Sequence, residues 1–168
     1  DIVYRNNHQT RDTLDKIEKI YYEIGAELAV VHPDVIEDWE IFSDYKMNWA
    51  IENMDVLKDK YKTVEELKTV FEKKSDWKLV IDLNHCYSND KTMKLADDII
   101  SNFNDRIAEI HLSGFADSSK LHDSLFQTKQ DFIIDYCKKL EVPIIIESVF
   151  DQFEDIKKEF NYINNQLK

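Results

Sequence analysis

Short apolar runs that end in a polar, chemically capable residue recur along the chain. The clearest lies within residues 78–86, KLVIDLNHC, where the apolar run ends at Asp82 and His85 comes three residues later. An apolar run without charges is typical of a strand buried on both faces, as in a parallel sheet covered by helices. The same pattern predicts four more strands, near residues 27–32, 49–53, 107–112 and 142–147.

Between these strands the apolar residues take the spacing of helices. Helices are predicted over residues 9–24, 63–74, 93–103, 132–140 and 153–167. Thr63 and Glu66 have the spacing of a capping box at the start of the second helix, and Ser88 or Asn89 is expected to cap the third. One or two helical turns are expected within 34–48, and 116–125 is a polar loop long enough to cover a site.

The alternation of strand and helix predicts a parallel sheet. An open five-stranded sheet would leave two edges exposed, and a (β/α)8 barrel needs about 250 residues. The 168 residues therefore correspond to about the last five β-α units of such a barrel. The expected fold is α/β, a (β/α)8 TIM barrel, with residues 1–168 forming a single domain that is incomplete at its N-terminus.

Composition narrows the function classes. With 43% hydrophobic residues the chain can build one sizeable core, no stretch approaches the roughly 18 apolar residues of a membrane span, and the first residues are no signal peptide. Two cysteines are too few for a disulfide framework, so a cytoplasmic location is expected. The net charge of −12 disfavours a broad electrostatic grip on nucleic acid, although bound divalent metals would reverse the charge locally. The chain could also form a homo-oligomer, and its composition does not decide this.

The polar residues at the strand ends predict a metal site. The carboxyl ends of parallel strands meet at one edge of the sheet, where the active sites of α/β proteins form. Glu52, Asp82, His111 and Glu147 would bring three carboxylates and one imidazole to this edge. Such an oxygen-rich set suits Mn²⁺, Mg²⁺ or Zn²⁺ and leaves room for substrate oxygens. The alternative is that these carboxylates cap neighbouring helices.

Several motifs follow one another along the chain: VHPD, AIENMD, IDLNHC, EIHLSGF with a later LHDSLF, and IIIES. In this order, on successive strand ends, they resemble the xylose-isomerase-like superfamily of TIM barrels. That superfamily includes sugar isomerases and epimerases, and apurinic-site nucleases of the endonuclease-four class. The resemblance covers nearly the whole chain and implies that Glu52, Asp82, His111 and Glu147 form the metal quartet. It does not choose among the reactions of the superfamily.

The resemblance also implies roles for three histidines. In the nuclease branch the positions of His32 and His85 bind additional zinc ions, whereas in the epimerase branch the position of His85 contacts the substrate. His122 lies where the nuclease pattern has Asp-x-His for a third zinc, but here Lys120 replaces the aspartate. A cation would oppose a nearby metal, so this departure counts against a trinuclear zinc site. Asp123 is the only obvious local substitute.

The first functional hypothesis is a divalent-metal-dependent isomerase or epimerase of a small sugar or polyol. The metal would bind adjacent oxygens of the carbohydrate and acidify the C–H next to its carbonyl. Glu52 and Glu147 would exchange the proton as base and acid. His85 would hold a substrate hydroxyl, and His122 would close over the substrate.

Two other hypotheses stay open. The chain is also compatible with a zinc-dependent apurinic-site endonuclease, in which an activated hydroxide hydrolyses a phosphodiester of abasic DNA. His32 and Glu52 would then hold one zinc, and Asp82, His111 and Glu147 another. The third hypothesis is a barrel that binds a ligand without turning it over, and the intact acidic quartet argues against it.

Overall fold

The five predicted strands pair into one parallel sheet in their sequence order, in a computed structural model that describes residues 2–116 and 122–168. The strands are β1 (Ala29–Val31), β2 (Trp49–Glu52), β3 (Lys78–Asp82), β4 (Ile107–Leu112) and β5 (Ile144–Ile146). Each neighbouring pair of these strands is parallel. The prediction of five parallel, consecutive strands is therefore confirmed.

Helices connect the strands. They are α1 (His8–Glu23), the 3₁₀ helices η1 (Pro33–Val35) and η2 (Glu40–Asp44), α2 (Val64–Lys73), α3 (Leu83–Asn89), α4 (Lys94–Phe103), α5 (Leu125–Thr128), α6 (Asp131–Cys137) and α7 (Phe153–Leu167). The apolar spacing predicts α1, α2, α4, α6 and α7, whereas α3 and α5 were not predicted. The capping box of Thr63 and Glu66 forms at the start of α2.

The predicted cap of α4 is wrong. Ser88 and Asn89 lie inside α3, because the Asp82 carboxylate accepts the His85 amide and starts that helix directly after β3. Asp90 then takes the role expected of Ser88 or Asn89, since its Oδ2 accepts the Leu95 amide at 2.9 Å. The physical reason is that a strand-end carboxylate serves well as an N-cap.

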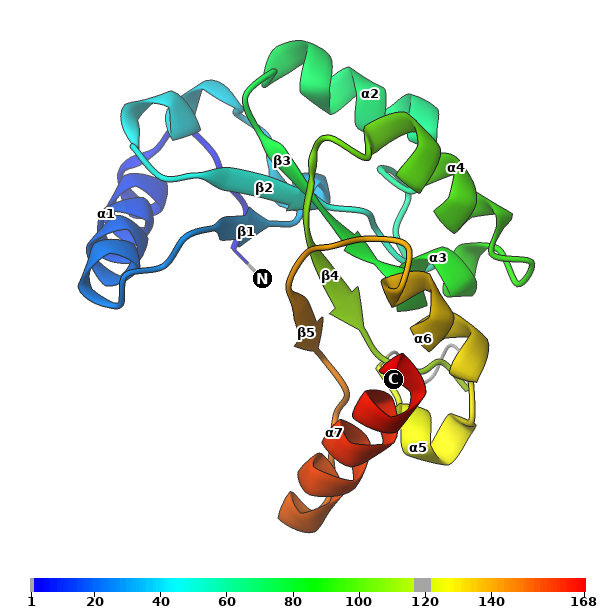
Figure 1. The fold of residues 1–168 in the computed structure, drawn as a ribbon. Coiled ribbons are helices and arrows are strands. Elements are labelled where there is room, and N and C mark those ends of the chain that lie inside the picture. Colours follow the sequence, from blue (N-terminus) through cyan, green and yellow to red (C-terminus); the bar gives the residue numbers. More distant parts are fainter. Residues whose placement is uncertain (1, 117–121) are drawn as a thin grey trace.

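The sheet curls into about half of a TIM barrel, which confirms the predicted fold class (Figure 1). Helices α2, α4 and α6 lie on its outer side, while β1 and β5 form the two edges. The central strands are the most deeply buried, with Leu79, Val80 and Ile81 of β3 fully covered. The edges are more open: Val30 of β1 and Ile145 of β5 are both about two-fifths exposed, at 38% and 43%. Because all five strands are parallel, their carboxyl ends lie at one shared edge of the half barrel.

Candidate metal centre

Four of the predicted side chains converge at this edge. One ligand atom from each of Glu52, Asp82, His111 and Glu147 lies within 4.8 Å of the others. Glu52 and Asp82 are the last residues of β2 and β3, and Glu147 directly follows β5. His111 belongs to β4 and is the register partner of Asp82. The expected convergence is thus present, and the role of these residues as metal ligands stays a prediction.

His111 lies between two of the carboxylates. Its Nε2 is 3.1 Å from Glu109 Oε1, and its Nδ1 is 3.2 Å from Glu52 Oε2 and 3.1 Å from Glu147 Oε1. Nδ1 nevertheless forms no hydrogen bond with either carboxylate, because the contacts lack the required direction. Two ligands of one ion, each bonded at about 2.1 Å, lie roughly 3.0–3.4 Å apart. The arrangement around Nδ1 therefore fits ligand atoms placed around a common centre.

Unpaired atoms test whether these residues fit a cation. Within the quartet, Glu52 Oε1, Asp82 Oδ2 and His111 Nδ1 are buried without a hydrogen-bond partner. Glu52 Oε1 lies 3.0 Å from His85 Nδ1, but the N–H of that ring atom is directed at the Asn53 carbonyl, 2.8 Å away. Buried polar atoms are rarely unpaired, and a bound ion is one explanation when they are. The quartet therefore fits a divalent cation.

The electrostatics of the cluster lead to the same conclusion. Burial opposes protonation of His111, yet the carboxylates of Glu147 and Glu52 outweigh it and raise its pKa to about 11. Burial also opposes protonation of His85, whose pKa is raised to about 9 by Asp82 and Glu52. Burial raises the pKa of Asp82 to about 7, whereas the close contacts with His111, His32 and His85 overcome burial and hold the pKa of Glu52 well below its usual range. The carboxylates thus attract positive charge into a buried site, as a cation site must.

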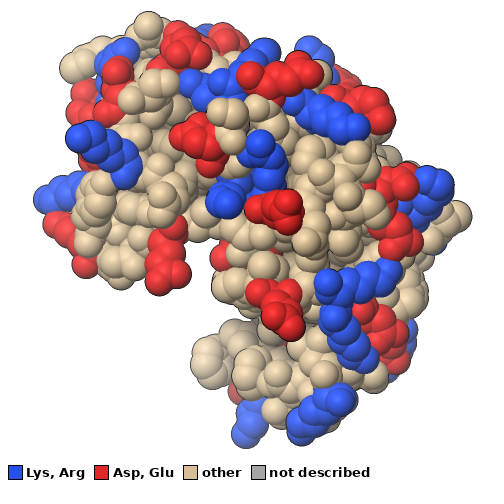
Figure 2. Space-filling model, turned by 45° about the horizontal axis from the view of Figure 1, so that its top comes forward, with Lys and Arg blue, Asp and Glu red and all other residues tan. Residues whose placement is uncertain are grey.

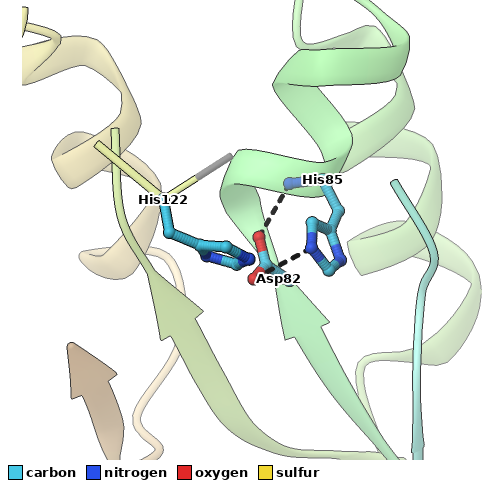
Figure 3. Close-up of side chains that lie close together, drawn as sticks. All are labelled: Asp82, His85 and His122. Atoms are coloured by element: carbon cyan, nitrogen blue, oxygen red, sulfur yellow. Dashed lines mark hydrogen bonds and ion pairs between the residues drawn. The ribbon is translucent and has the colours of Figure 1, made fainter. Parts of the chain in front are cut away.

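Asp82 also belongs to a second group of candidate ligands, with His85 and His122 (Figure 3). Its Oδ2 lies 3.7 Å from His85 Nε2. The rings of His85 and His122 are 5.4 Å apart, and His122 Nδ1 lies 3.0 Å from Ser113 Oγ and 3.7 Å from Glu147 Oε2. The structure therefore brings His85 and His122 beside the quartet, where they can contact a substrate or a second ion.

His32 lies at the margin of the site. Its Nε2 is 3.3 Å from Glu52 Oε2, and its side chain is 48% exposed. It belongs to neither group of candidate ligands found among the described residues. Its expected role as a metal ligand remains a prediction.

Two residues that support the site were missed in the sequence. Asn53 is fully buried; its Oδ1 accepts the Asp82 amide at 2.8 Å, and its Nδ2 donates to the Asp82 carbonyl at 3.1 Å. Glu109 faces the ring of His111 from two positions earlier in β4. Residues two apart in a strand share a face, so the pair Glu109 and His111 was a signal that the sequence carried.

Comparisons with known proteins add little detail. No protein-family model matches the chain, and no curated protein matches it. One solved structure that the chain matches is that of 3-keto-D-glucoside 4-epimerase, YcjR, from E. coli in its apo form. The chain is distantly similar to a sugar epimerase. The TM-score is 0.49 at 11% sequence identity, and the match covers 93% of this chain and 52% of the epimerase, so the chain spans about half the length of that protein.

The helices of the half barrel are short or amphipathic. Within the described residues, none is both long and apolar enough to cross a membrane.

Proposed function

We propose that this chain supplies the metal-binding part of a divalent-metal-dependent isomerase or epimerase that acts on a small sugar or polyol. The observation that carries the proposal is the quartet of Glu52, Asp82, His111 and Glu147, with its three unpaired buried atoms. Mn²⁺, Mg²⁺ and Zn²⁺ all suit such a donor set. The remaining strands of the barrel, from the same protein or from another copy, would complete the pocket.

In this proposal the four residues would hold the ion, which would supply Lewis-acid polarisation of the substrate carbonyl. Glu52 and Glu147 flank His111 Nδ1 at 3.2 and 3.1 Å and would exchange the proton of the substrate carbon as base and acid. Glu147 is the more accessible of the two, since its side chain is 31% exposed and that of Glu52 only 3%. Glu147 therefore meets an incoming substrate first.

The two histidines of the second group have a separate part in the proposed reaction. The Nδ1–H of His85 is engaged by the Asn53 carbonyl, so its Nε2 faces the site and can bind a substrate hydroxyl. His122 would contact the substrate from the side of Glu147. Both roles concern orientation, which brings the reacting carbon within reach of the glutamates.

One observation favours the second candidate function, a zinc-dependent apurinic-site endonuclease. The group of Asp82, His85 and His122 offers ligands for an additional ion, and the nuclease reading needs more than one. Against it stand the exposed position of His32 and the net charge of −12. Basic side chains on the face in Figure 2 are interspersed with acidic ones, whereas binding to a DNA backbone favours a continuous basic surface. The isomerase or epimerase is therefore our preferred proposal.

A pair of substrates tests this choice in the intact protein: a panel of ketoses and an abasic DNA duplex. Glu147→Gln should lower proton exchange at the substrate carbon by at least about 10²-fold, the usual contribution of general acid–base catalysis. His32→Ala should change the exchange rate far less. Glu141→Gln and His8→Ala, at exposed positions, are the matched controls.

Cleavage of abasic DNA by the unaltered protein, lost together with bound zinc in His32→Ala, would overturn the preferred proposal. Metal binding without turnover of either substrate would leave the third hypothesis, a barrel that binds a ligand without turning it over.

We place the protein in the cytoplasm, in keeping with its two free, buried cysteines.

A further inference from the structure

Glu159 is a fully buried carboxylate in α7 that has no part in the proposed chemistry. Its oxygens accept three hydrogen bonds: from the Leu125 amide at 2.8 Å, the Phe126 amide at 2.9 Å and the Ser148 hydroxyl at 2.6 Å. Among the described residues, no lysine, arginine or histidine forms an ion pair with it. A buried carboxylate is costly unless hydrogen bonds satisfy it, so these three bonds define its surroundings.

The three donors belong to two segments that carry site residues. Ser148 directly follows Glu147, and Leu125 comes three residues after His122. A backbone hydrogen bond also joins these segments, since the Val149 amide donates to the His122 carbonyl at 2.8 Å. Glu159 and this backbone bond therefore link the two segments that carry Glu147 and His122. The side chains of these two residues lie 3.7 Å apart.

Glu147 needs such support because of its place in the sheet. It directly follows β5, an edge strand whose only neighbour among the described strands is β4. The Glu147 amide bonds to the Leu112 carbonyl at 3.0 Å, so the ladder holds the backbone from one side. Ser148, held by Glu159, supplies the next restraint along the chain. Strand ends at an edge are otherwise the part of a sheet that opens most readily.

We infer that Glu159 is a positioning residue of the candidate metal centre, which sets Glu147 and His122 at the distance that the site requires. The inference rests on the proposed function, because it takes Glu147 to be a metal ligand. Residues that orient a metal ligand through hydrogen bonds commonly change metal affinity by 10–100-fold when they are replaced.

The test is a Mn²⁺ titration of the intact protein, with thermal unfolding and the NMR signals of the His122 imidazole recorded on the same variants. Glu159→Gln keeps the size of the side chain but turns an amide NH₂ toward a donor, and it should weaken Mn²⁺ binding by about tenfold. Glu159→Ala should weaken it further. Both should move the imidazole signals of His122 and leave those of the exposed His8 unchanged. The control is Glu154→Gln, an exposed glutamate of the same helix.

Ser148→Ala removes one of the three donors to Glu159. It tests the positioning role of Glu159 if the Glu159 variants do not fold. It should weaken Mn²⁺ binding by about fivefold, the order expected from one hydrogen bond. A lower melting temperature with unchanged Mn²⁺ affinity and unchanged His122 signals, in whichever of these variants fold, would show a purely structural role and overturn the inference. If the unaltered protein binds no Mn²⁺, the proposed function fails first and the inference falls with it. Binding by the unaltered protein that no variant weakens refutes the inference alone.

Discussion

Glu109 offers a prediction that depends on the geometry around His111. Its carboxylate lies 3.1 Å from His111 Nε2 and fixes the ring so that Nδ1 faces Glu52 and Glu147. A hydrogen bond that involves a charged group contributes about 1.5–3 kcal/mol, and every 1.4 kcal/mol changes an equilibrium constant tenfold. The Glu109 side chain is only 18% exposed, so water screens the contact weakly. Glu109→Ala should therefore weaken metal binding by roughly 10–100-fold.

Calorimetric titration with Mn²⁺ measures this change. Glu109→Gln can still accept a hydrogen bond from Nε2, and it should lie between Glu109→Ala and the unaltered protein. Glu141→Gln, at an exposed position before β5, is the control and should bind Mn²⁺ as the unaltered protein does. Equal affinities for Glu109→Ala and the control would show that the ring orientation of His111 has no bearing on metal binding.

Three stability predictions follow, each measured by chemical or thermal unfolding. Asn53→Ala should cost about 2 kcal/mol, because it leaves the buried amide of Asp82 without its side-chain acceptor and removes the bond to the Asp82 carbonyl; unchanged stability would contradict this. Gly114→Ala should cost about 1–3 kcal/mol, since the added methyl would lie 2.5 Å from Thr128 Oγ1, and the cost should shrink in a background of Thr128→Ala. Thr63→Ala should cost about 1 kcal/mol by removing the cap of α2, and a loss below a few tenths would show that the capping box adds little.

The strands and the site edge could be predicted because their signals are local. Each strand is a short apolar run, and each run ends at the residue that the fold brings to the shared edge, as Glu52 and Asp82 show. Alternation along the chain then predicts the parallel order, which brings the four residues of the quartet to one edge of the sheet.

Two groups of contacts that support the site, those of Asn53 and of Glu159, could not be predicted in the same way, because they join distant residues. Asn53 bonds to Asp82 across 29 positions, and Glu159 bonds to Leu125 across 34. Nothing near either residue in the sequence indicates its partner. Whether His32 belongs to the site was harder to predict for another reason. It follows the edge strand β1, and its side chain is 48% exposed at the margin of the site. A strand-end position alone does not say how far a side chain reaches inward.

The loop before His122 was expected to cover the site, and its residues 117–121 lie outside the described part of the chain, Lys120 among them. The described residues on either side are held in place: the Gly114 amide bonds to the Asp123 carbonyl at 2.6 Å, and Asp123 Oδ2 accepts the Ala116 amide at 2.9 Å. Asp123, the local substitute for the missing aspartate, is thus engaged with the backbone.

The number of metal ions bound by the intact protein tests the central claim most directly. Elemental analysis after equilibration with Mn²⁺ or Zn²⁺ should find one ion per chain, and Glu52→Gln should lower that content while Glu154→Gln should not. Two or three ions per chain would favour the nuclease. No bound ion, or an ion that persists unchanged in Glu52→Gln, would contradict the claim that Glu52, Asp82, His111 and Glu147 form a metal centre.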